Sequence, residues 1–260
     1  MLVDTHAHVQ VRQFESDRDA VIQAAFSAGI ARMIVPGVDL PSSQSAVALA
    51  RAFPNQLFAG VGTHPHDAET LTDEVLAAQR ALAGSPGVVA IGEIGLDYYR
   101  DLSPRDIQRA ALVAQIGLAR ELHLPIILHN RDSFDDMIAL LREHAQGVTG
   151  VFHCFIGDKA MARQALDLGF YLSFAGPVTY PRNAELAEVA TWAPEDHILV
   201  ETDSPYLAPQ SVRGKRNEPR HVALVAHHVA SLRGIPDEEL ARITTRNAEA
   251  LFDLQNRNPR

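Results

Sequence analysis

The side chains best suited to chemistry are histidines and acids placed at or just beyond the ends of short apolar segments. His6 and His8 stand two residues apart in LVDTHAHV at residues 2–9, and in a β-strand such residues point to one face. The same placement recurs along the chain for His64, His66, Glu93, Asp97, His129, His153, Glu201 and Asp203. Imidazole and carboxylate groups are typical ligands of Zn²⁺ and Mn²⁺.

The surrounding pattern predicts the elements that must position these groups. We expect strands at residues 2–9, 31–38, 57–65, 88–97, 125–130, 150–155, 170–176 and 198–205. Helical spacing occupies residues 16–29, 42–52, 72–83, 103–123, 133–146, 158–168, 183–192 and 219–253, the last split at Gly234-Ile235-Pro236. A Ser pair is expected to cap the second helix, and Ser103 the fourth.

Strands that alternate with helices indicate an α/β protein with a parallel sheet. Eight such units in 260 residues predict a closed (β/α)₈ TIM barrel, and the alternative is an open doubly wound sheet. Because the chain has no linker and no low-complexity tract, we expect a single domain over residues 1–260.

In such a barrel the active site lies at the carboxyl ends of the strands, where these histidines and acids would meet. A buried unpaired charge costs several kcal/mol, so the cluster requires cations. Six of the groups would supply two metal sites, particularly if Glu93 bridges the ions: His6, His8, Glu93, His129, His153 and Asp203. Asp203 could also take the proton of an attacking water, and Glu201 could orient a ligating histidine.

Composition limits the function classes. The net charge of −9 argues against a protein that holds nucleic acid mainly by charge, so a polyanion would need a local site or metal ions. Cys154 is the single cysteine, which excludes an internal disulfide and suggests a reducing compartment. We see no signal peptide and no apolar run long enough for a membrane span. We therefore expect a cytoplasmic protein without membrane contact or an obligate protein partner.

A locally cationic stretch, SVRGKRNEPRH at residues 211–221, follows the last predicted strand. Arg213 and Lys215 could grip a phosphate backbone from this position. A solvated loop is the equally simple alternative.

Seven motifs, in order from residue 4 to 219, resemble the TatD family of metal-dependent hydrolases, the TatD-type deoxyribonucleases. They are DTHAH, GTHPH, GEIGLDY, LHNRDS, FHCF, ETDSPYLAP and RGKRNEP. The resemblance implies a TIM barrel with two divalent ions that hydrolyses phosphodiester bonds, usually of DNA. It assigns His6, His8 and Asp203 to one ion and His129 and His153 to the other, with Glu93 as the bridge.

The resemblance also implies substrate contacts. It places His64 and His66 near the substrate phosphate, and it suggests that Arg131 and the loop after the last strand line the cleft.

We therefore predict a two-metal hydrolase that uses Zn²⁺, Mg²⁺ or Mn²⁺ and cleaves DNA, as a 3′→5′ exonuclease on single strands or strand ends. The alternative is an amidohydrolase-type enzyme that cleaves a small-molecule ester, lactone or amide. A barrel kept only for binding would predict broken ligand positions, and all six are present.

Overall fold

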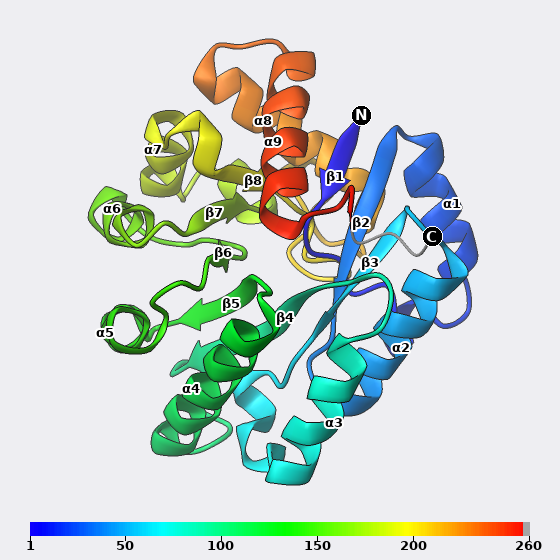
Figure 1. Ribbon diagram of the computed structural model, residues 1–260. Helices are drawn as coiled ribbons and strands as arrows, with labels where there is room; N and C mark the ends of the chain where they lie inside the picture. Colours follow the sequence, from blue (N-terminus) through cyan, green and yellow to red (C-terminus); the bar gives the residue numbers. More distant parts are fainter. Residues whose placement is uncertain (257–260) are drawn as a thin grey trace. The chain divides into compact units, whose positions relative to one another are not determined.

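The computed structural model describes residues 1–256 and contains eight strands that alternate with helices (Figure 1). The strands form one sheet in the order β1-β2-β3-β4-β5-β6-β7-β8. This order is that of a (β/α)₈ TIM barrel and differs from the reversed order of a doubly wound sheet, so the predicted fold class is confirmed. The strands are Leu2–Asp4, Ile30–Pro36, Leu57–Val61, Val88–Asp97, Ile126–Arg131, Gly150–Phe152, Tyr171–Phe174 and Ile198–Val200.

The helices agree closely with the predicted ranges within residues 1–256. They are α1 Arg18–Ser27, α2 Leu40–Ala52, α3 Asp73–Ala83, α4 Arg105–Leu122, α5 Phe134–His144, α6 Lys159–Asp167, α7 Ala184–Trp192, α8 Val222–Arg233 and α9 Asp237–Phe252. None of these helices is both long and apolar enough to span a bilayer.

Two of the predicted helix caps are wrong. Asp39 caps helix α2: its carboxylate accepts the N–H of Ser42, while the Ser42 hydroxyl accepts the N–H of Asp39. Helix α4 has Pro104 at its cap position and no side-chain cap. Ser103 instead donates its hydroxyl to the backbone oxygen of His66 at 2.8 Å. A local motif cannot show that a distant carbonyl competes for this hydroxyl.

Contacts divide the chain into two compact units. The first unit comprises Met1–Val35, His153–Asp167 and Tyr171–Ala250. The second comprises Pro36–Phe152, Leu168–Phe170 and the described part of the chain from Leu251 onward. The expectation of a single domain remains a prediction, and its last four positions, 257–260, lie outside the described residues.

In the first unit, several strands are shorter than predicted. Strand β1 ends at Asp4 and β8 ends at Val200, so His6, His8 and Asp203 lie beyond strands and not within them. The backbone remains paired there: the N–H of Asp203 donates to the oxygen of His6 at 2.9 Å, and the N–H of His8 donates to the oxygen of Ser204 at 2.8 Å. Because these segments are no longer regular strands, even spacing alone does not fix the directions of the two imidazoles.

The second unit contains β4, whose ten residues are all buried, as expected for a strand covered on both faces. Gly95 of this strand pairs with His129 of β5. A Cβ atom at Gly95 would lie 1.9 Å from the backbone oxygen of His129, and the φ of Gly95 is +148°. Only glycine therefore allows β5 to approach closely enough to place His129 beside β4.

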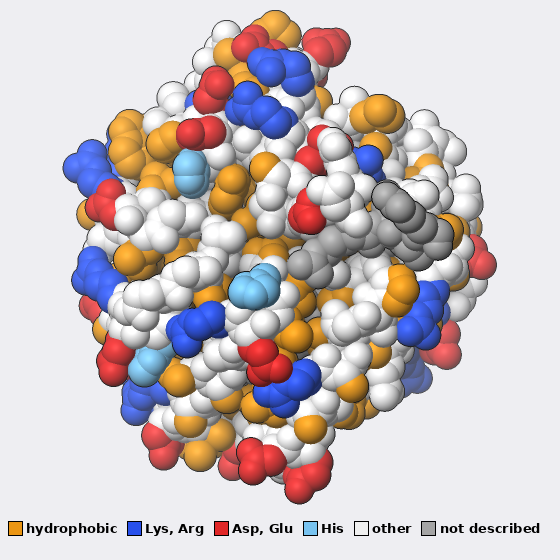
Figure 2. Space-filling view, viewed as in Figure 1, with side chains coloured by type: hydrophobic (Ala, Val, Ile, Leu, Met, Phe, Trp, Pro, Cys, Tyr) orange, Lys and Arg blue, Asp and Glu red, His pale blue; other side chains and the backbone are white. Residues whose placement is uncertain are grey.

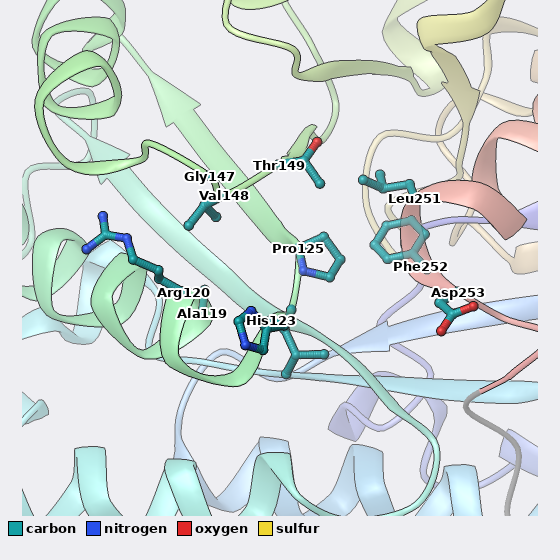
Figure 3. A pocket seen from close by; sticks show the side chains of 11 residues that line it. Ala119, Arg120, His123, Pro125, Gly147, Val148, Thr149, Leu251, Phe252 and Asp253 are labelled. Carbon is teal, nitrogen blue, oxygen red and sulfur yellow. The ribbon is translucent and has the colours of Figure 1, made fainter.

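A pocket in the second unit lies at the amino ends of β5 and β6 (Figure 3). It is lined by the end of α4, the segment before β6 and the end of α9, including His123, Pro125 and Phe252. His129 lies near the opposite, carboxyl end of β5. Within the second unit, this pocket is therefore separate from His129.

Candidate metal centre

In the first unit, His6, His8 and Asp203 converge on one point. Their ligand atoms all lie within 4.8 Å of one another. The Nε2 atoms of His6 and His8 are 3.0 Å apart, and Oδ1 of Asp203 is 3.5 Å from Nε2 of His8 and 3.9 Å from Nε2 of His6. All three side chains are buried. Two imidazoles and one carboxylate in this arrangement could hold a divalent cation.

Asp203 is held in its charged form. Burial alone would raise the pKa of its carboxyl group, but the hydrogen bond from His8 and the nearby imidazoles of His153 and His6 outweigh burial and lower the pKa. The carboxylate is therefore available at neutral pH as a ligand or as a proton acceptor.

Asp4 supports this group through hydrogen bonds to the chain segments that carry it. Its buried carboxylate accepts the backbone N–H of Thr202 at 2.9 Å, the hydroxyl of Thr202 at 2.6 Å and the backbone N–H of His6 at 3.3 Å. These bonds tie the end of β1 to the segment that carries Asp203. Asp4 thus acts on the backbone and does not join the three converging ligand atoms.

His153 follows β6 and lies against His6, with ring centroids 3.8 Å apart. Its Nδ1 lies 3.2 Å from Oε1 of Glu201, and the same oxygen accepts the backbone N–H of Cys154 at 2.7 Å. A proton on Nδ1 leaves the lone pair on Nε2, the form that binds a metal ion. The contact between Glu201 and a histidine was expected from the sequence, and the structure identifies that histidine as His153.

In the second unit, His64, Glu93 and His129 form another group whose ligand atoms lie within 4.8 Å of one another. Nδ1 of His129 is 3.0 Å from Oε1 of Glu93, and Nε2 of His64 is 3.4 Å from the same oxygen. Glu93 and His64 are buried, and His129 is partly exposed.

His64 is better suited to donating a hydrogen bond than to binding a cation. Burial lowers its pKa to about 4, although Glu93 opposes this effect, so the ring is neutral at pH 7. Its Nδ1 accepts the backbone N–H of His66 at 3.1 Å, which leaves the proton on Nε2. This N–H group could reach a carboxylate or a phosphate oxygen, and the substrate role that the family resemblance implies for His64 stays a prediction.

His129 faces Glu93 with Nδ1, whereas His64 faces it with Nε2, because Asp97 lies next to Nε2 of His129. Oδ2 of Asp97 is 3.1 Å from Nε2 of His129 and 2.7 Å from Nε2 of His66. With its proton on Nε2, His129 presents the lone pair of Nδ1 to the carboxylate of Glu93. Two acceptors at 3.0 Å repel each other unless a cation or a proton lies between them, so this pair fits a metal ion.

Asp97 contacts two histidines of this unit, although the sequence motifs assign it no role. The sequence places it at the end of a predicted strand. Glu93 and Asp97 are separated by four residues in one strand, and this even spacing places both on the same face as Gly95. The spacing was therefore a sequence signal that Asp97 lies on the same face of the strand as Glu93.

The predicted substrate residues are less closely grouped. Arg131 ends β5 and lies over the ring of Tyr99, 3.9 Å from its centroid. Arg213 lies over the ring of Tyr180 at 4.9 Å, and Lys215 is exposed on the same loop.

The loop that carries these cations is anchored within the first unit. The side-chain amide of Asn217 donates to the backbone oxygens of Thr202 and Tyr206, at 2.8 and 2.7 Å. Arg216 forms a two-point ion pair with Asp17, at 2.9 and 2.6 Å. Arg216 is therefore engaged in holding the loop, and Arg213 and Lys215 are the cations more available to a ligand. Basic and acidic side chains are mixed over the face drawn in Figure 2.

Residues 3–253 match the model of the family described as TatD related DNase. The chain belongs to this family. It is 44% identical over 255 residues to a protein of Bacillus subtilis named uncharacterized metal-dependent hydrolase YabD, covering 98% of this chain and all of that one. It is 39% identical to the 3′-5′ ssDNA/RNA exonuclease TatD of Erwinia amylovora, covering 97% of this chain and 100% of the relative.

Solved structures agree with this assignment. The crystal structure of the TatD homologue YJJV from Escherichia coli matches with a TM-score of 0.91 and 32% identity, over 97% of this chain and 98% of that one. Membership in the TatD family identifies the chain as a metal-dependent hydrolytic enzyme. The hypothesis of a barrel kept only for binding is therefore rejected.

Proposed function

We propose that this TatD-family hydrolase cleaves phosphodiester bonds of DNA, removing nucleotides from the 3′ end of single strands or strand ends. The observation that carries the proposal is the pair of groups His6–His8–Asp203 and His64–Glu93–His129, each of which joins carboxylate and imidazole atoms within 4.8 Å. The relative named a 3′-5′ ssDNA/RNA exonuclease, at 39% identity, supports the substrate class.

Two divalent ions per chain are proposed as cofactors. His6, His8 and Asp203 would hold one ion, His129 and His153 the other, and Glu93 would bridge them. When bound, such ions lower the pKa of a coordinated water towards about 7 and neutralise charge on a phosphodiester. The imidazole ligands suit Zn²⁺, whereas the carboxylates are ligands that Mg²⁺ and Mn²⁺ also accept.

The protein's own groups would carry out the remaining steps. Asp203, whose lowered pKa keeps it ionised, would accept the proton of the attacking water. Glu201 would keep His153 in the correct orientation through the contact at Nδ1.

The substrate contacts are proposed from both units. His64 would donate its Nε2 proton to a phosphate oxygen, and His66 would assist it from two residues away. Arg131, Arg213 and Lys215 would supply positive charge at exposed positions, which a protein with a net charge of −9 needs in order to hold DNA. We also propose a cytoplasmic location, because the single cysteine permits no internal disulfide, and action without an obligate protein partner.

The test uses single-stranded DNA labelled at either end, with protein freed of metal and reloaded with Zn²⁺, Mn²⁺ or Mg²⁺. We expect a 3′ label to be released first as a short product, while a 5′ label remains on a shortening fragment. A preparation shown to hold two ions per chain that leaves both substrates intact would refute the proposal.

A second candidate is hydrolysis of a small-molecule ester, lactone or amide, which the net charge of −9 favours. A double variant with Arg213→Ala and Lys215→Ala separates the two. If DNA is the substrate, this variant raises KM for DNA and leaves hydrolysis of a small neutral ester unchanged. If a small molecule is the substrate, a panel of lactones, amides and esters should include one that is cleaved much faster than DNA.

A further inference from the structure

The carboxylate of Asp97 lies behind the imidazoles of His129 and His66 in the second unit. It is fully buried, and its Oδ2 atom is shared by Nε2 of His66 at 2.7 Å and Nε2 of His129 at 3.1 Å. Its other oxygen, Oδ1, accepts the backbone N–H groups of Tyr99 and Arg100, at 3.0 and 2.8 Å. Both oxygens therefore have defined partners.

The orientation of this carboxylate is fixed by the backbone. Two N–H donors at one oxygen fix the plane of the carboxylate, because intermediate rotations would leave them without an acceptor. The backbone N–H of Asp97 itself donates to Oε1 of Gln108 at 2.8 Å, and the amide of Gln108 donates to the oxygens of Asp97 and Ser103. Helix α4 thus holds the end of β4 in place, and Oδ2 faces the imidazoles as a consequence.

We propose that Asp97 is a positioning residue that sets the tautomer of His129. By accepting the proton of Nε2, it directs the lone pair of Nδ1 toward Glu93, where a metal ion would bind. The inference rests on the proposed metal-dependent function and assigns Asp97 a part in it. A histidine that binds a metal through one nitrogen commonly donates the other N–H to a carboxylate, which fixes the ring and strengthens the ligand.

The substitution Asp97→Asn distinguishes positioning from a purely structural role. The two backbone donors keep the amide oxygen at the Oδ1 position, so the turn after β4 is retained. The amide nitrogen then occupies the Oδ2 position and presents N–H groups to Nε2. His129 must give up its proton there and carry it on Nδ1, which removes the lone pair from the side of Glu93.

Asp136→Asn is the matched control. Asp136 is a carboxylate of the same unit that accepts the hydroxyl of Tyr98 at 2.7 Å and pairs with Arg109 at 3.1 Å. It has no place in the proposed catalytic or binding machinery, and the chemical change is the same.

The first measurement is metal affinity by competition with a chelator, together with the number of ions per chain and the circular dichroism of the metal-free protein. We expect Asp97→Asn to remain folded and to bind one of its ions about 10- to 100-fold more weakly. Asp136→Asn should match the unsubstituted protein. Asp97→Asn combined with His129→Ala should bind no more weakly than His129→Ala alone, because Asp97 acts through that ring.

The second measurement uses the protein with Asp97 in place, so it does not depend on whether Asp97→Asn folds. Long-range proton–nitrogen NMR spectra of the metal-free, unsubstituted protein at pH 8 report which nitrogen of His129 carries the proton, with the signals assigned by His129→Gln. A proton on Nε2 supports the inference, and a proton on Nδ1 overturns it. Unchanged metal affinity in Asp97→Asn overturns it as well.

These results are separable from the proposed function. Failure of the metal-loaded, unsubstituted protein to cleave DNA would refute the proposed substrate and leave the role of Asp97 standing. Conversely, DNA cleavage with unaltered metal binding in Asp97→Asn would refute the role of Asp97 alone.

Discussion

The contact between Glu201 and His153 allows a quantitative prediction. Oε1 of Glu201 accepts from Nδ1 of His153 and from the backbone N–H of Cys154, at 3.2 and 2.7 Å, and Glu201 is fully buried. Glu201→Ala leaves both donors without their acceptor, and each stranded buried donor costs about 1–3 kcal/mol. Loss of the buried carboxylate offsets part of this cost, because its own desolvation is relieved. We expect Glu201→Ala to lower the free energy of unfolding by about 2 kcal/mol, at the lower end of the range.

Glu201→Gln should behave differently, because the amide oxygen can occupy the Oε1 position and keep both donors satisfied. Oε2 of Glu201 has no hydrogen-bond partner among the described residues, so an amide nitrogen there exchanges one unpartnered atom for another. Metal affinity should therefore fall about 10- to 100-fold in Glu201→Ala and less in Glu201→Gln.

Two assays check this reasoning. Without metal, the thermal unfolding midpoint of Glu201→Ala should lie about 4–8 °C below that of the unsubstituted protein, since about 1 kcal/mol corresponds to 2–4 °C in a chain of this size. Chelator competition should rank the proteins as unsubstituted, Gln, then Ala. If Glu201→Ala binds metal as tightly as the unsubstituted protein, the assigned role of Glu201 is refuted.

Three further predictions concern pH, metal and backbone packing. Burial raises the pKa of Asp4 from 3.8 to about 8, so the folded state binds this proton more tightly than the unfolded state. The contribution of Asp4 to the free energy of unfolding therefore falls as pH rises from about 4 to 8. Asp4→Asn cannot titrate and should remove this pH dependence from the urea midpoints measured across the range. Chelation should lower the thermal midpoint, because a ligand at 100 times its Kd contributes about 2.7 kcal/mol; an unchanged midpoint would argue against a metal site. Gly95→Ala should cost at least about 2 kcal/mol in urea unfolding, since its Cβ would lie 1.9 Å from the oxygen of His129. Gly117→Ala, in α4 with nothing within 4 Å, should instead stabilise by up to about 1 kcal/mol.

In each unit a buried carboxylate lies beside one nitrogen of a proposed metal-binding histidine. In the first unit Glu201 faces Nδ1 of His153, and in the second unit Asp97 faces Nε2 of His129. The two rings are therefore held by opposite nitrogens. Each would present its other nitrogen to a cation, so the side of the ring that binds metal depends on the position of the carboxylate and not on the residue type.

Much of the fold was predictable because its signals are local. Buried parallel strands read as short runs of apolar residues, and the intervening helices show their own period, so alternation indicated a parallel sheet and the eight repeats favoured a barrel over a doubly wound sheet. The break at Gly234-Ile235-Pro236 was also visible, and the structure has Gly234 as the left-handed cap of α8 with α9 starting at Asp237. The candidate ligands could be named because the ends of parallel strands gather at one edge.

The tertiary structure decided what local patterns could not express. It ended β1 at Asp4, and it bonded the carboxylate of Asp4 to Thr202, a residue 198 positions away. In the folded chain, the hydroxyl of Ser103 donates to the backbone oxygen of His66 and does not cap α4. The orientation of an imidazole depends on which acceptor lies behind it, and that acceptor comes from another strand or a distant loop. The sequence by itself therefore determined which residues could bind metal, and only the folded chain determined which nitrogen of His129 and of His153 faces a buried carboxylate from another element.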